Sequence, residues 1–326
     1  MKRRAFLELG GVLVAMPRRV VAQPSPLVHH IAILDDAADG ARNETWPVFR
    51  KRLSEFGLVE GRNVVVTVRY AGGVSEGLNA LAAEIVAAKP DIIVTPGTPT
   101  TRAVLRATST IPVVFVGAAD PVGAGLVVSL AKPGANVTGV SIMATETSQK
   151  TLELLHELAP SAERVAFLTD TANQAAAAAY SRLEEKARSL KLSIRLLDGV
   201  GTTALERSFA TISRDRVQGL LVGFPGTLLD HRDAIIQSAL REKLPVVYGR
   251  REYVVAGGLM SFDVDRAYGL GRAAILVQKI LGGAKPADLA VEQIHKTRLD
   301  LNMKTARAQG LRIPDSIRLR ADEVIE

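Results

Sequence analysis

Short apolar, β-branched runs alternate along the chain with longer segments in which apolar residues recur at helical spacing. The short runs predict buried strands and the longer segments predict amphipathic helices. In the first half we predict strands at 31–34, 64–70, 91–95, 112–116 and 137–142, and helices at 46–56, 78–88 and 99–107. Because strands that alternate with helices of this length usually form parallel sheets, the pattern predicts an α/β fold.

A second set of alternating segments follows a break near Ser141. We predict strands at 165–169, 194–197, 219–223, 245–248 and 258–262, and helices at 148–158, 175–190, 204–213, 232–242 and 265–281. The tail from Glu292 lacks the alternation, apart from a short strand at 298–303 and a helical turn at 305–309. Two sets predict two lobes, each with a parallel sheet. We place residues 28–141 and 263–326 in lobe 1 and residues 142–262 in lobe 2.

Polar and aromatic residues follow the predicted strands, where ligands of open α/β sheets usually bind. The candidate ligand-binding residues at or near these strand ends are Asp35, Asp36, Thr98, Thr100, Asp120, Ser141, Asp170, Phe224, Arg250 and Tyr253. Two lobes whose strand ends face one another form a clamshell. We place its hinge crossings at 141–143, 248–250 and 261–263.

Each candidate has a role and an alternative. Thr98 and Thr100 open a helix and could bind a carboxylate, or could only cap the helix. Asp120 could accept an ammonium group or cap a helix, and the aromatic side chains of Phe224 and Tyr253 could contact a ligand or belong to the core. Arg250 offers a second anion contact. The only tryptophan, Trp46, lies on a predicted helix away from the strand ends, which argues against a sugar site.

Residues 1–22 have the order of an export signal: a basic start, a short apolar run and a cleavage site of small residues. Arg3 and Arg4 fit a twin-arginine signal, and the general secretory route stays open. Without this segment, which holds five basic residues and one acidic residue, the 41 basic and 34 acidic side chains become 36 and 33, a net charge of +3. The basic residues are scattered, so we do not expect nucleic-acid binding.

Composition excludes several kinds of chemistry. The chain has no cysteine, which rules out disulfides, thiol nucleophiles, Cys-ligated metals and a lipid-modified cysteine. No apolar run after the signal approaches the length of a membrane span, and none of the five histidines follows a predicted strand beside a carboxylate. Gly269 and Gly271 match a dinucleotide fingerprint, but they lie inside a predicted helix, where close helix packing explains them better. We therefore expect no cofactor, metal or catalytic residue.

Blocks at 120–127, 132–141, 251–261 and 302–326 resemble the substrate-binding proteins of ABC transporters related to tryptophan/tyrosine uptake. This resemblance implies the fold of type I periplasmic binding proteins, with two Rossmann-like lobes, three crossing strands and a ligand in the cleft. It also implies a periplasmic location and an inner-membrane permease as partner. Many relatives carry a serine where this chain has Arg250, which weakens the inference of an aromatic amino acid as ligand.

We therefore expect an exported solute-binding protein, with no enzymatic activity and no direct membrane insertion, that binds a small organic anion or zwitterion resembling an amino acid. Two alternatives stay open: a periplasmic sensor subunit of a signalling receptor, and a periplasmic enzyme.

Overall fold

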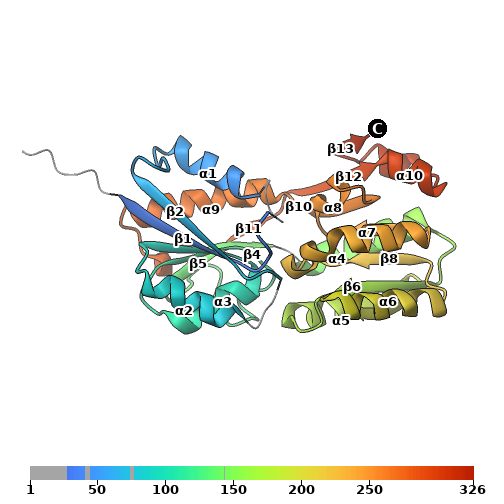
Figure 1. The fold of residues 1–326 in the computed structure, drawn as a ribbon, viewed down its shortest axis with the longest axis horizontal. Coiled ribbons are helices and arrows are strands. Elements are labelled where there is room, and N and C mark those ends of the chain that lie inside the picture. Colours follow the sequence, from blue (N-terminus) through green and yellow to red (C-terminus); the bar gives the residue numbers. More distant parts are fainter. Residues whose placement is uncertain (1–27, 41–44, 74–76, 143) are drawn as a thin grey trace, which may run out of the picture.

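The computed structural model describes residues 28–40, 45–73, 77–142 and 144–326, and the predicted signal at 1–22 lies outside these ranges. Two α/β lobes lie end to end, as Figure 1 shows. Within the described residues, no helix is long and apolar enough to cross a membrane.

The first lobe is built on a six-stranded sheet in which every neighbouring pair is parallel. Its strands, in the order β11-β5-β4-β3-β1-β2, are Glu292–Ile294, Val137–Ile142, Val113–Ala118, Ile92–Pro96, His29–Asp35 and Val64–Tyr70. Helices α1 (Thr45–Glu55) and α9 (Arg266–Leu281) pack on one face, and α2 (Leu78–Ala87) and α3 (Gly97–Ala107) pack on the other. The strands are apolar on both faces because helices cover both.

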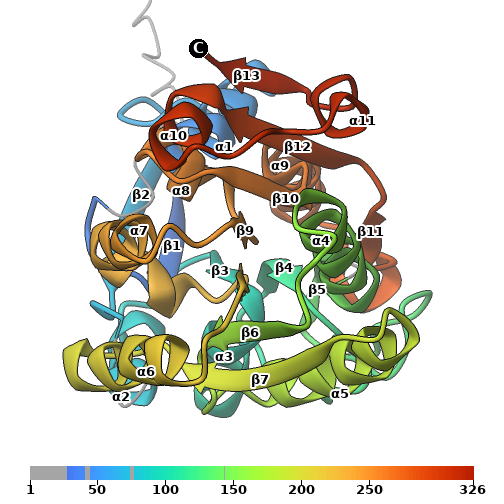
Figure 2. The same cartoon turned by 90° about the vertical axis from the view of Figure 1, so that its right-hand side faces the viewer.

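The second lobe has a seven-stranded sheet, which Figure 2 shows from its outer end. Its strands, in the order β13-β12-β10-β9-β8-β6-β7, are Glu323–Ile325, Thr297–Asn302, Met260–Val264, Val246–Tyr248, Gly219–Val222, Arg164–Thr169 and Ser193–Asp198. Its helical segments are α4 (Ala144–Leu158), α5 (Gln174–Ser189), α6 (Thr202–Arg214), η2 (Gly226–His231), α7 (Arg232–Arg241), α8 (Arg251–Val255), α10 (Met303–Gln309) and α11 (Asp315–Arg318). One 3₁₀ turn, η3 (Pro286–Asp288), lies beside the first sheet, near β5.

The end of the chain belongs to the second lobe, so the predicted placement of all of 263–326 in lobe 1 is wrong. Strand β12 pairs antiparallel with β10 and buries Leu299 and Leu301 against the second core. Strand β13 then pairs parallel with β12. Only the part of this segment that holds α9 and β11 packs with the first sheet. In this position β12 forms backbone hydrogen bonds with β10 on one side and β13 on the other.

The chain passes between the sheets three times: after β5, between β10 and α9, and between β11 and β12. The first crossing follows the predicted one at 141–143, of which Met143 lies outside the described residues. The third predicted position, 261–263, lies just before the crossing at 264–266. The prediction at 248–250 is wrong, because β9 and α8 both pack in the second lobe. The crossing that was missed lies at 294–297.

The glycine pair at 269 and 271 lies inside α9, as predicted. A Cβ at Gly269 would come within 2.4 Å of Ile294 Cδ1. This glycine therefore lets α9 approach β11 closely, in agreement with the packing interpretation of the motif.

Candidate functional site

A cavity lies between the two lobes, and its walls come from both sheets. Counted out to the solvent at its mouth, its empty volume is about 980 Å³. The apolar side chains of its wall include Trp46, Val116, Ile142, Phe167, Phe224, Leu270 and Ile294. The polar and charged side chains are those of Asp36, Thr45, Thr98, Thr169, Asn173, Arg250 and Arg266. The cavity therefore combines a mostly apolar wall with a few polar groups.

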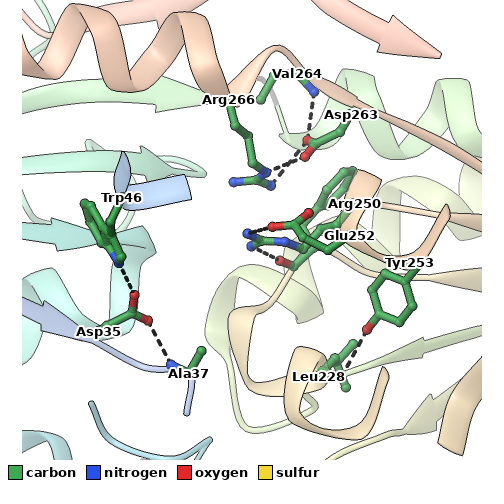
Figure 3. A network of polar contacts seen from close by, with 11 residues as sticks. Asp35, Ala37, Trp46, Leu228, Arg250, Glu252, Tyr253, Asp263, Val264 and Arg266 are labelled. Carbon is green, nitrogen blue, oxygen red and sulfur yellow. Dashed lines mark hydrogen bonds and ion pairs between the residues drawn. The ribbon is translucent and has the colours of Figure 1, made fainter. Parts of the chain in front are cut away.

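Trp46 is fixed in the wall on the side of the first lobe. Its Nε1 donates a hydrogen bond of 2.7 Å to Asp35 Oδ2, and the Ala37 amide donates one of 2.9 Å to Asp35 Oδ1. Figure 3 shows this arrangement. The expectation that Trp46 lies away from the strand ends is wrong, because α1 runs back over the sheet and brings this first-turn residue to the carboxyl end of β1. Asp35 itself serves to hold Trp46 and the following loop.

Arg250 is the most deeply buried cation of the cavity wall, with 4 % of its surface exposed. Its Nη1 donates to the Phe224 carbonyl at 3.2 Å and its Nη2 donates to Glu252 Oε1 at 2.9 Å. Its buried Nε has no hydrogen-bond partner among the described residues. Burial alone would raise the pKa of Glu252, but Arg250 and Arg266 outweigh it and lower this pKa to about 2.

Arg266 lies beside Arg250 and belongs to the first turn of α9 (Figure 3). Its Nη2 donates to Asp263 Oδ1 at 3.2 Å, and its Nε donates to the other oxygen. Burial raises the pKa of Asp263 to about 6, although the neighbouring guanidinium opposes the shift. Arg266 was missed by the sequence analysis. Its position just after a predicted strand and crossing is the signal that could have identified it.

Four of the ten predicted site residues line the cavity: Asp36, Thr98, Phe224 and Arg250. Asp36 and Thr98 come from the strand ends of β1 and β3 in the first lobe, and Phe224 and Arg250 follow β8 and β9 in the second. The structure thus brings together predicted residues that are far apart in sequence.

Four further predicted residues hold their own lobe together and do not line this cavity. The Thr100 hydroxyl donates to the Pro96 carbonyl in the first turn of α3. The Ser141 hydroxyl donates to the Glu292 carbonyl at 3.3 Å, between β5 and β11. Asp120 accepts from the Gly123 amide at 2.8 Å, and the residues that follow it, 121–125, form a turn and not the helix of the capping alternative. Asp35 holds Trp46, as described above.

The last two predicted residues belong to the second lobe. Tyr253 is fully buried, stacks on Tyr248 with 4.6 Å between ring centroids, and donates to the Leu228 carbonyl at 3.1 Å. It is a core residue, which is the second of the two alternatives for this side chain. Asp170 accepts from Thr227 Oγ1 at 3.0 Å, and burial raises its pKa. Asp170 lines a second groove, which shares Thr98 and Asn173 with the main cavity.

The geometry of the cavity favours binding of an organic acid. Two guanidinium groups lie side by side in a largely apolar wall, where a carboxylate can form charge-assisted hydrogen bonds. Among the described residues, none that lines the cavity is a histidine, serine or lysine, and no group of acidic and histidine side chains could hold a metal ion.

Known proteins resemble this chain over nearly its whole length. The sequence profile of the family "ABC transporter substrate binding protein" matches residues 30–325. A curated tyrosine-binding protein of Clostridioides difficile is 26 % identical over 300 residues, which are 92 % of this chain and 82 % of that protein.

Solved structures agree with this relationship. A conserved domain protein of Vibrio cholerae has a TM-score of 0.85 and 26 % identity, covering 91 % of this chain and 99 % of that one. A Streptococcus pneumoniae protein in complex with L-Trp has a TM-score of 0.84 and 24 % identity, covering 91 % and 100 %. The predicted fold of two parallel-sheet lobes is thereby confirmed as that of type I periplasmic binding proteins. The chain belongs to the family of ABC transporter substrate-binding proteins.

Proposed function

We propose that this protein is the exported solute-binding component of an ABC uptake system and binds a small amino-acid-like molecule between its lobes. One observation carries the proposal: the guanidinium groups of Arg250 and Arg266 lie in the wall of a cavity that is otherwise mostly apolar. A ligand carboxylate could form charge-assisted hydrogen bonds with them there.

The carboxylate would bind to Arg250 and Arg266, which lie next to each other in the cavity wall. Thr98, at the start of α3, lines the same cavity, and the N-terminus of this helix favours an anion as well. These groups belong to different lobes, so a bound carboxylate would join them.

The rest of the ligand would match the remaining wall. Trp46, Phe167 and Phe224 provide aromatic surface, and the carboxylate of Asp36 could accept hydrogen bonds from an ammonium group. The names of two relatives support an aromatic amino acid, since one is a tyrosine-binding protein and another was crystallised with L-Trp.

Ligand capture would work by closure of the lobes. A molecule that contacts both lobes at once favours the closed arrangement by its differential affinity. The closed, loaded form would then dock on an inner-membrane permease from the periplasm. In this account the protein binds its ligand without converting it.

A thermal-shift panel tests the proposal. We expect L-tryptophan or L-tyrosine to stabilise the mature protein, by about 2.7 kcal/mol at a hundredfold excess over the dissociation constant. Tryptamine, which lacks the carboxylate, and neutral sugars should leave the melting temperature unchanged. Indole-3-propionate, which lacks only the ammonium group, measures the contribution of Asp36. Stabilisation by sugars or tryptamine alone would contradict the proposal.

A further inference from the structure

The two lobes touch at the edge of the cleft that lies farthest from the hinge crossings. In the first sheet, β11 and β5 lie at the end where the chain crosses between lobes, and β1 and β2 lie at the opposite end. Asp230, in η2 of the second lobe, reaches the loop after β1 at this far edge. Its Oδ1 accepts a hydrogen bond of 2.9 Å from the Ala38 amide.

A glycine makes room for this contact. Gly73, in the loop after β2, is buried, and a Cβ built on it would lie 2.2 Å from Asp230 Oδ2. A Cβ at position 73 would therefore displace the Asp230 carboxylate from its place beside the Ala38 amide while the lobes stay closed. The neighbouring Gly72 also has a positive φ, which is +62° there and +76° at Gly73. A Cβ on Gly72 would nevertheless meet nothing within 4 Å.

Both partners are held by contacts within their own lobe. In the first lobe, the Gly73 amide donates to the Asp36 carbonyl at 2.8 Å, which joins the two loops beneath Asp230. In the second lobe, Leu228 and Leu229 are buried core residues that fix η2. Asp36 also lines the cavity, so the contact at the edge and the ligand-binding wall share one loop.

We infer that Asp230 is a latch, a contact that holds the two lobes in the closed arrangement. Its carboxylate packs against Ala38 and Gly73 of the first lobe, and the closed lobes retain the ligand. The retention of ligand rests on the proposed function. The contact between the lobes does not, because both of its partners are groups of the protein. Because the contact needs no ligand, it favours the closed form before binding. It thereby reduces the share of the ligand's binding free energy that closure consumes.

The test compares Asp230→Ala and Gly73→Ala with two matched controls. Gly72→Ala introduces the same strain of a positive φ without the collision. Asp233 lies three residues after Asp230, and Asp233→Ala removes an exposed carboxylate that pairs with Arg232. Hydrogen exchange of the Ala38 amide and the radius of gyration are measured without ligand, and the affinity for L-tryptophan is measured by calorimetry.

In Asp230→Ala and Gly73→Ala we expect the closing equilibrium to shift about tenfold toward the open form, so that Ala38 exchange accelerates, the radius of gyration increases and the affinity for L-tryptophan falls several-fold. Both controls should match the wild type. If Gly73→Ala does not fold, Asp230→Ala decides alone. Unchanged Ala38 exchange and radius of gyration in Asp230→Ala would overturn the latch. A further outcome is that the variants differ from the wild type in Ala38 exchange and radius of gyration without ligand, while the wild type binds neither L-tryptophan nor L-tyrosine. In that case the ligand assignment fails and the latch stands.

Discussion

At the scale of single residues, Arg250 has two tasks that substitutions can separate. It neutralises Glu252, with which it shares a hydrogen bond of 2.9 Å, and it faces the cavity. Removing one member of a buried ion pair costs about 3–5 kcal/mol, whereas replacing both members with apolar side chains is often neutral. A matched pair of variants can therefore distinguish a structural role from a role in binding.

We expect Arg250→Met alone to lower both the free energy of unfolding and the affinity for L-tryptophan. The double variant Arg250→Met/Glu252→Met should recover most of the stability, because no uncompensated carboxylate remains at position 252. Its affinity should stay about 10- to 100-fold below that of the wild type, the effect of a lost charge-assisted hydrogen bond. Urea unfolding and calorimetry measure the two quantities. A double variant that binds L-tryptophan like the wild type would exclude Arg250 as the carboxylate site.

Asp263 makes stability depend on pH in a direction that is unusual for a carboxyl group. Burial raises its pKa in the folded protein to about 6, above a value of about 3.9 in the unfolded chain. The folded state therefore binds the proton more tightly, and the resulting stabilisation is complete below about pH 4 and lost as the pH rises through 6.

The variant Asp263→Asn, which is neutral at every pH, isolates this effect. We expect the free energy of unfolding of the wild type, relative to the variant, to fall by up to about 3 kcal/mol between pH 4 and pH 7. Glu252 titrates in both proteins, so its opposite contribution cancels from the comparison. A difference between wild type and variant that stays constant over this range would show that Asp263 keeps an ordinary pKa.

At the scale of elements, the sequence predicted the regular part of the fold. The strands at 64–70 and 137–142 agree with β2 and β5 at both ends, because β-branched runs between turn residues are a local signal. The three-residue strands β11 and β13 had no such signal. They exist because an edge of a sheet offers them hydrogen bonds. The error over 297–326 and the missed crossing at 294–297 both follow from these short strands.

The site could be predicted only as a region. Strand ends locate where side chains gather, and Asp36, Thr98, Phe224 and Arg250 are found on the cavity for that reason. The direction of a side chain depends on packing that lies outside its own segment. Trp46 reaches the cavity because α1 packs back over β1, whereas Tyr253 points into the core, where it stacks on Tyr248.

At the scale of the whole molecule, closure is expected to join three groups of contacts. The crossings near β5, β10 and β11 would act as the hinge, the guanidinium pair would bind the ligand's acid group between the lobes, and the latch at Asp230 would close the far edge. A ligand that contacts both lobes would add its binding energy to that of the latch. Binding and compaction should therefore occur together.

Small-angle scattering with and without ligand tests this account most directly. The probe is L-tryptophan or L-tyrosine, whichever raises the melting temperature more, at saturation. We predict that the radius of gyration of the wild type decreases on binding and that the Arg250→Met/Glu252→Met variant, at the same ligand concentration, shows no decrease. A wild-type protein that is saturated according to calorimetry, yet keeps its ligand-free radius of gyration, would contradict closure of the lobes around a bound amino acid.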